Sequence, residues 1–189
     1  MINYNNIPKE MKEFNNWVLY KKVKRDNNKY TKQPYQVNGR LANVSDSKTW
    51  NSFDNVIKVL KTNKNYSGIG FVFTKSPFIG VDIDHCYSYL VPQGGDVDIK
   101  GGKNTKIGLE MYNTGRYFTV TGNVIKNYET LSNDVSGFMD IYNRYITKEK
   151  NNHEERELNN PPQNNISSSI DEKVDDIINN IRKSRQSEL

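Results

Sequence analysis

The apolar residues of this chain gather in short runs that end at turn-forming residues, and this pattern constrains the fold more than any other feature. Five runs have the length and composition of strands: residues 17–22, 68–74, 78–84, 109–112 and 116–122. Only short turns separate the second run from the third and the fourth from the fifth. The sequence therefore predicts two antiparallel hairpins.

Helical and loop signals are fewer. Three segments have helical signals: residues 7–14, residues 48–62 after the N-cap signal Ser45-Asp46-Ser47, and residues 135–146. Three further segments predict irregular or extended chain: a basic, Asn-rich loop at 24–32, a short extended piece at 33–37, and a Gly- and Pro-rich loop at 91–104. Helices and strands thus share residues 1–150, which we predict to be the folded domain.

The last 39 residues differ from the rest in composition and charge. Residues 1–150 hold 22 basic and 14 acidic residues, a net charge of +8, whereas residues 151–189 hold five and eight, a net −3. Residues 151–169 combine an Asn- and Pro-rich stretch with a serine run, which predicts a disordered linker. Residues 170–187 place isoleucine and valine on one face of an amphipathic helix, which needs a partner surface to be stable.

Composition excludes several classes of protein. A single cysteine, Cys86, excludes an internal disulfide framework and a cysteine-built zinc site. No apolar run approaches the roughly 20 residues that span a bilayer, and the N-terminus has no signal-peptide pattern. We therefore expect a cytoplasmic protein without a membrane partner. The basic body makes a polyanion a natural partner.

Asp82 and Asp84 are the sharpest candidates for chemistry. Alternate side chains of a strand share a face, so the two aspartates project together while Val81 and Ile83 enter the core. Two carboxylates about 7 Å apart repel each other unless a divalent cation lies between them. Oxygen ligands favour Mg²⁺ or Mn²⁺, and two such ions organise nucleotidyl transfer. Two ordinary aspartates at a solvent-facing strand end are the alternative.

Glu110 and Arg116 form the second candidate. Glu110 lies among apolar neighbours in a predicted strand, where an unpaired carboxylate is costly. A metal ion, or Arg116 across the turn, would balance its charge. Arg116 could instead hold a triphosphate through its two-pronged guanidinium. A plain Glu–Arg pair across the hairpin is the remaining alternative.

A basic stretch with interleaved tyrosines is the third candidate. Its predicted nucleic-acid contacts are Lys21, Lys22, Lys24, Arg25 and Lys32. Lysines that neutralise a phosphate backbone beside aromatic rings that stack on bases are typical of single-strand binding. A charged hairpin facing water has the same composition. His85, directly after the aspartate pair, is a candidate ligand or acid–base group, although a histidine that ends a strand is often structural.

Six segments, taken in their order along the chain, resemble those of a known protein family. They are residues 17–20, 32–34, 47–53, 68–74, the motif Gly80-Val81-Asp82-Ile83-Asp84-His85-Cys86, and residues 109–122. These segments resemble the N-terminal primase-polymerase domain of phage and mobile-element replication proteins, in the archaeo-eukaryotic primase superfamily. The helical pattern at the end of the chain is similar to the segment that leads, in that family, into a superfamily-3-type helicase.

The resemblance implies an α+β fold: a primase-polymerase-like core whose mixed or antiparallel sheet is related to the RNA-recognition motif, flanked by helices. It implies template-directed nucleotidyl transfer with Mg²⁺ or Mn²⁺, in DNA replication. Asp82, Asp84 and Glu110 would be catalytic metal ligands, and Arg116 and His85 would contact the nucleotide. Single-stranded DNA and nucleoside triphosphates would be partners. Residues 170–187 would contact a helicase or a second copy of the chain.

The sequence departs from the family pattern in two places. Between Asp84 and Glu110 it has no Ser-x-Gly-x-Gly-x-His motif, whose histidine contacts the incoming nucleotide in the family, and we expect no helicase to follow. Two functions follow from these departures. The protein is either a minimal primase-polymerase, or a truncated, catalytically inactive relative that binds DNA or a replication partner; a decayed fragment without a role is a third possibility.

Overall fold

The computed structural model describes residues 2–26, 28–83, 88–92, 99, 101–124 and 136–147 of the 189-residue chain. The chain forms two compact units. Unit 1 comprises Met1–Ser76 and Asn113–Leu131, and unit 2 comprises Pro77–Tyr112 and Ser132–Leu189. The predicted linker at 151–169 and helix at 170–187 lie outside the described residues. Within the described part, no helix has the length and apolar character needed to span a bilayer.

Strands dominate both units. Unit 1 contains η1 (Tyr4–Asn6), α1 (Lys9–Lys12), β1 (Trp17–Lys24), β2 (Tyr30–Tyr35), η2 (Ser47–Thr49), α2 (Phe53–Thr62), β3 (Gly68–Val72) and β8 (Tyr117–Val120). Unit 2 contains β4 (Phe78–Ile83), β5 (Ser88–Pro92), β6 (Gly102–Asn104), β7 (Leu109–Tyr112), α3 (Ser136–Ile141) and the π-helical turn η3 (Tyr142–Thr147). The mixed α+β class predicted from the sequence is confirmed in this form, with antiparallel sheets and few helices.

The sheet of unit 1 has the strand order β2-β1-β3-β8, and all three neighbouring pairs are antiparallel. Helix α2 packs on one face of this sheet, on β1 and β3. The centre of that contact is aromatic: the ring of Trp17 lies 5.0 Å from Phe53 and 5.1 Å from Phe71, in both cases edge to face. Alternation along β1 therefore buries Trp17 and Leu19 on the helix side and turns Tyr20 and Lys22 to the other face.

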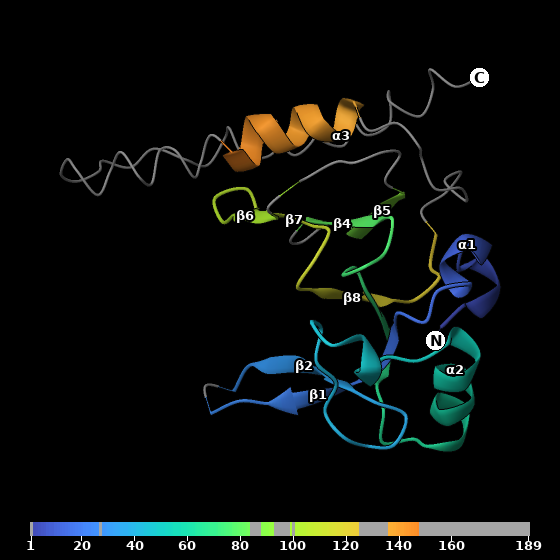
Figure 1. Ribbon diagram of the computed structural model, residues 1–189. Coiled ribbons are helices and arrows are strands. Elements are labelled where there is room, and N and C mark those ends of the chain that lie inside the picture. The colour runs from blue at the N-terminus through green and yellow to red at the C-terminus, as the bar shows by residue number, and fades with distance from the viewer. Residues whose placement is uncertain are drawn as a thin grey trace. The chain divides into compact units, whose positions relative to one another are not determined.

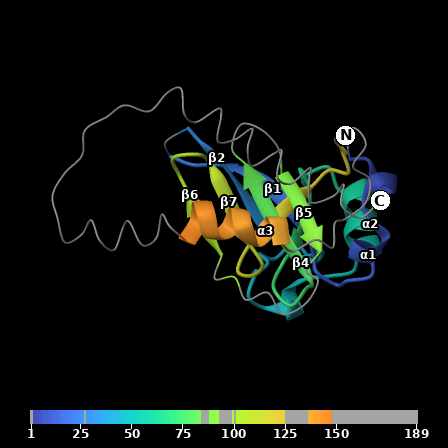
Figure 2. The ribbon, with the colours of Figure 1, turned by 90° about the horizontal axis from the view of Figure 1, so that it is seen from above.

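The sheet of unit 2 has the order β5-β4-β7-β6, again antiparallel throughout. Helix α3 and the turn η3 cover one face of it, as Figures 1 and 2 show. The residues buried beneath them are mostly aliphatic: Ile79, Val81, Ile83, Leu109 and Met111 from the strands, and Phe138, Ile141, Tyr142 and Ile146 from α3 and η3. Since alternate residues of β4 and β7 enter this core, the residues between them project from the opposite face.

Both predicted hairpins are wrong. The strands exist, but β3 pairs with β1 and β8, whereas β4 pairs with β5 and β7, and β8 does not pair with β7. The chain passes from one unit to the other at each of the two short turns, after Ser76 and after Tyr112. A short turn between apolar runs favours a hairpin only where neither strand has a better partner, and here each strand joins a different sheet.

Two other boundaries differ from the predictions. The cap at Asp46 starts only the short turn η2, where its side chain accepts a hydrogen bond from the Lys48 N–H. The chain is then extended through Trp50, whose indole donates to the Asn43 carbonyl at 2.7 Å, and α2 begins after the second cap, Ser52. The loop predicted at 91–104 is wrong at both of its ends, because β5 extends to Pro92 and β6 begins at Gly102.

Candidate functional site

Asp82 and Glu110 lie directly opposite each other in the sheet of unit 2. They are register partners in the antiparallel pair β4–β7, so their side chains project from the same face. Both residues are half-buried. Directly opposed residues have Cβ atoms about 5 Å apart, and two carboxylates in that position repel each other. The sequence suggested both residues as acidic ligands, and the strand pairing adds that they are immediate neighbours.

The local sequence explains why these carboxylates share a face. Val81, Ile83, Leu109 and Met111, which flank them, are all buried under α3 and η3. A shift of one residue in either strand would bring its carboxylate into this apolar core and its apolar residues to the surface. The hydrophobic pattern therefore fixes the register, and the register in turn sets Asp82 opposite Glu110.

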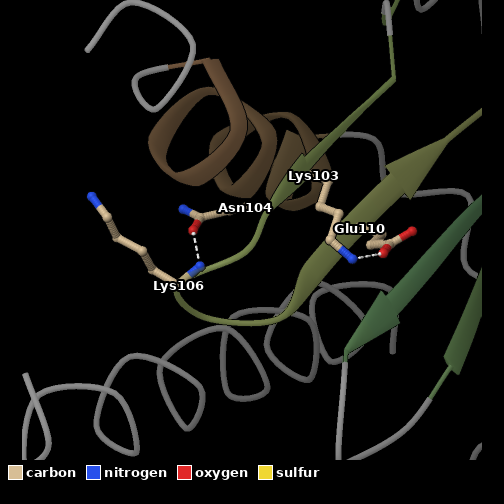
Figure 3. Close-up of polar contacts among 4 residues, drawn as sticks. All are labelled: Lys103, Asn104, Lys106 and Glu110. Carbon is tan, nitrogen blue, oxygen red and sulfur yellow. Dashed lines mark hydrogen bonds and ion pairs between the residues drawn. The ribbon is translucent and has the colours of Figure 1, made fainter. Parts of the chain in front are cut away.

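Lys103 continues the same row on the next strand. It is the register partner of Glu110 in β6–β7, and its ammonium group forms an ion pair with Glu110 Oε1 (Figure 3). Lys103 was not predicted from the sequence, where nothing distinguishes it from other lysines. In the short turn between β6 and β7, the Asn104 side chain accepts from the Lys106 N–H. The hairpin across which Glu110 and Arg116 were expected to pair is not formed, since β7 and β8 are not neighbours in either sheet.

The oxygen donors of Asp82 and Glu110 suit a divalent cation. Asp82 and Glu110 offer carboxylate oxygens on one face of adjacent strands, which is the donor chemistry that Mg²⁺ and Mn²⁺ prefer. Asp84 and His85 lie outside the described residues. In the part of the chain that the structure describes, no group of three acidic, histidine or cysteine side chains is close enough to hold a metal. The described pair fits a metal ion but makes up only two of the three expected ligands.

Arg116 belongs to unit 1, at the start of β8. Its side chain is exposed, and its Nη1 donates to the Gly115 carbonyl at 3.2 Å. Next to it, the Gly115 N–H donates to the Thr74 hydroxyl at 2.9 Å. These contacts tie the turn before β8 to the chain that follows β3. The carboxylate pair belongs to the other unit, unit 2.

The predicted nucleic-acid residues divide between two faces of the unit 1 sheet. Lys22 and Lys32 are register partners in β1–β2, and Lys24 is paired with Tyr30, which places all of these on one face. Lys21 lies on the opposite face, with its ammonium 4.6 Å from the Tyr35 ring centre and 4.9 Å from that of Tyr66. Arg25 follows the end of β1 and donates to the Thr31 hydroxyl at 3.3 Å.

Two tyrosines lie on the same face as Lys22 and Lys32. A Cβ atom added at Gly68 would come within 2.7 Å of the Tyr20 ring, and one added at Gly70 within 2.3 Å of the Tyr117 ring. The rings therefore lie directly on the backbone of β3, which only glycine permits. Burial raises the pKa of both hydroxyls, and that of Tyr117 is raised further by the neighbouring Tyr20. The sequence signal for this packing was Gly68-Ile69-Gly70 in an otherwise apolar strand.

Two hydrogen bonds cross the sheet from Lys32 on β2 to Tyr117 and Thr119 on β8. The Tyr117 hydroxyl donates to the Lys32 carbonyl at 2.7 Å, and the Lys32 ammonium donates to the Thr119 hydroxyl at 3.0 Å. Because these contacts join β2 to β8, they hold the basic hairpin against the rest of its sheet. Lys22, Lys24 and Lys32 are all exposed, so this face presents positive charge to solvent. We name it the basic face, defined by Lys22, Lys24 and Lys32.

Comparison with known proteins agrees with the resemblance of the sequence motifs. No family model matches the chain. A DNA primase-polymerase of Nitratiruptor phage NrS-1 is 31% identical to it, over 61% of this chain and 20% of the relative. The chain thus spans about a fifth of the length of that protein. This similarity supports a primase-polymerase-like relationship for the chain.

Proposed function

We propose that this chain carries the nucleotidyl-transfer site of a phage or mobile-element DNA replication protein, and that it polymerises nucleotides on a single-stranded DNA template. The observation that carries the proposal is the register of β4 and β7, which sets Asp82 against Glu110 on the face of the sheet opposite α3. The similarity to a phage DNA primase-polymerase supports the same conclusion. The membership of the archaeo-eukaryotic primase superfamily, with a core related to the RNA-recognition motif, is part of this proposal.

Asp82, Asp84 and Glu110 are the proposed metal ligands. Two bound Mg²⁺ or Mn²⁺ ions would activate a primer 3′ hydroxyl and neutralise the triphosphate. The chain's own contribution is positional: adjacent strands fix Asp82 and Glu110 so that their carboxylates already face each other. Mutual repulsion of these carboxylates favours the cation-bound state.

Arg116 and His85 are the proposed nucleotide contacts, and the basic face is the proposed template surface. An arginine guanidinium binds phosphate oxygens in a bidentate manner. On the basic face, Lys22, Lys24 and Lys32 would neutralise backbone phosphates, and the 68% exposed ring of Tyr30 offers a stacking surface to a base. Arg25, which follows the end of β1, remains a proposed contact beside this surface, whereas Lys21 lies on the opposite face of the sheet, over Tyr35 and Tyr66.

A primer-synthesis assay tests the catalytic proposal. Wild-type protein is incubated with a single-stranded template, labelled nucleotides and Mn²⁺, beside Asp82→Asn and Glu110→Gln, which keep side-chain shape and remove charge. We expect product from the wild type and at least a hundredfold less from either variant, since a ligand to a catalytic metal is lost. Asp140→Asn, an exposed acidic residue of α3 outside the site, is the matched control and should retain activity. Full activity of Asp82→Asn would refute the metal assignment.

A non-catalytic protein that binds DNA or a replication partner is the second candidate. The observation that favours it is the charge of unit 1, which holds 16 basic and six acidic residues and so a net +10 in a unit without the carboxylate pair. In this case the wild type makes no product. Its affinity for single-stranded DNA would be unchanged in Asp82→Asn and would fall steeply with salt. Absent or salt-independent binding would exclude this candidate.

A further inference from the structure

Lys103 gives the carboxylate pair a positive neighbour on the same face. The row Asp82, Glu110 and Lys103 runs across three adjacent strands, β4, β7 and β6, in continuous register. Figure 3 shows the Lys103 side chain reaching along the sheet to the Glu110 carboxylate. The row therefore has two negative groups followed by one positive group, and the positive group is on the outer strand.

The ion pair is open enough to be exchanged. The Lys103 side chain is 42% exposed and that of Glu110 is 21% exposed, so the lysine is the more solvent-accessible partner of the pair. An ion pair with this exposure contributes at most about 1 kcal/mol to stability. A lysine ammonium lies at the end of a flexible four-carbon stem with several rotatable bonds. Breaking the pair therefore costs little, and the lysine can turn to another anion nearby.

The backbone of the β6–β7 hairpin, by contrast, is held in place. The Asn104 side chain, 6% exposed, accepts from the Lys106 N–H at 3.1 Å and donates to the Tyr145 carbonyl of η3 at 2.8 Å. These bonds anchor the hairpin to the helical layer of unit 2. The anchor fixes the backbone of Lys103 beside Glu110, and the lysine stem has rotatable bonds beyond that fixed point.

A divalent cation and the Lys103 ammonium compete for the same carboxylate. A cation bound at Glu110 would repel the ammonium, and the phosphates of a nucleotide on that cation would attract it. We infer that Lys103 is a positioning residue with two partners: it holds Glu110 before the cation binds, and it contacts the phosphates of the nucleotide afterwards. This inference rests on the proposed function, and it assigns the phosphate contact to a residue that no sequence motif marked.

Metal and nucleotide binding by the 189-residue chain separate this role from a structural one. Calorimetric titration with Mn²⁺ alone should give about threefold to tenfold tighter binding in Lys103→Met than in the wild type, because a competing positive charge is gone. Titration with a non-hydrolysable nucleoside triphosphate analogue in saturating Mg²⁺ should give about tenfold weaker binding in the same variant. One substitution thus moves two affinities in opposite directions. Lys103→Arg should keep the nucleotide affinity within about threefold of the wild type.

Lys106→Met is the matched control. It removes the same charge from the same hairpin, but Figure 3 shows the Lys106 side chain pointing away from Glu110. Both of its affinities should equal those of the wild type. Thermal melting of each variant checks folding, and Lys103→Gln is the second variant should Lys103→Met fold poorly.

The outcomes distinguish this inference from the function on which it rests. If Mn²⁺ binds the wild type and not Asp82→Asn, while Lys103→Met equals the wild type in both titrations, the inference fails and the proposed metal site stands. Weakening of both affinities in Lys103→Met would also overturn it, since that is the result of a purely structural role. A wild type that binds no Mn²⁺ would overturn the metal site and the inference together.

Discussion

The two units differ in charge and in the composition of their cores. Unit 1 holds 16 basic and six acidic residues, whereas unit 2 holds 11 basic and 16 acidic, so their net charges are +10 and −5. The core of unit 1 centres on the rings of Trp17, Phe53 and Phe71. The core of unit 2 is mainly aliphatic, with Ile79, Val81 and Ile83 under one helix and one helical turn.

The difference in charge indicates a division of roles that the whole-chain charge of +5 conceals. A surface that binds a polyanion needs a positive field, and a site that binds divalent cations needs a negative one. The chain places the basic face in unit 1 and the paired carboxylates in unit 2. Each unit is thus suited to one of the two kinds of ligand that the proposed polymerisation requires.

Truncation of the largest core residue should destabilise unit 1 most. Trp17 is fully buried, contacts two aromatic rings edge to face and donates its indole N–H to the Met11 carbonyl at 3.1 Å. Trp17→Ala should lower the free energy of unfolding by about 3–5 kcal/mol. Hydrogen-exchange mass spectrometry should show the loss of protection in β1 and β3, while β4 and β7 keep theirs.

Ile141→Ala is the reciprocal variant for unit 2. Ile141 is 1% exposed under α3, and its truncation should cost about 2–5 kcal/mol, with protection lost in β4 and β7. An equal loss of protection throughout the chain in both variants would show that the two units unfold together and not independently.

The glycines beneath the two tyrosines should be the next most sensitive positions. A Cβ at Gly70 would lie 2.3 Å from the Tyr117 ring and 3.0 Å from the Phe118 carbonyl, so Gly70→Ala should destabilise the protein by about 1–3 kcal/mol. Chemical denaturation measures the effect. Tyr117→Leu in the same chain should recover part of the loss, and a double variant no better than Gly70→Ala would place the strain in the backbone instead.

The strands were easier to predict than their partners. Short apolar runs identified β1, β3, β4, β7 and β8 to within a few residues, because each strand has residues that must be buried. Pairing was missed because it depends on which sheet each strand joins, and the local turns between β3 and β4 and between β7 and β8 carry no such information. Asp82 and Glu110 were suggested by residue type. Lys103 was missed because a lysine has no signal of its own until register sets it beside a carboxylate.

Alkaline pH should weaken unit 1 through Tyr117. Burial raises the pKa of its hydroxyl above the ordinary 10.0, so the folded chain holds this proton more tightly than the unfolded chain. The resulting stabilisation is fully present below pH 10 and is lost as the pH rises beyond it, by about 1 kcal/mol per pH unit. Urea denaturation should show that the free energy of unfolding falls less between pH 9 and pH 11 in Tyr117→Phe than in the wild type. Equal falls would show that ionisation of the Tyr117 hydroxyl is not the cause.

The smallest effect should distinguish the two faces of β1. Lys21 and Lys22 are adjacent and carry the same charge, but Lys22 lies on the basic face and Lys21 lies over the rings of Tyr35 and Tyr66. Lys22→Gln should weaken single-stranded DNA binding about threefold and reduce the slope of log K against log salt by about 0.7, the share of one phosphate contact. Lys21→Gln should leave the slope unchanged and lower the free energy of unfolding by about 0.5–1 kcal/mol, because the ammonium loses its contact with the rings.

Fluorescence anisotropy at several salt concentrations measures the DNA affinity and the slope of each variant. Since the two variants have equal net charge, a difference in slope reports the face on which each lysine lies. Equal slopes would show that DNA binding depends on the total charge of unit 1 and not on the basic face.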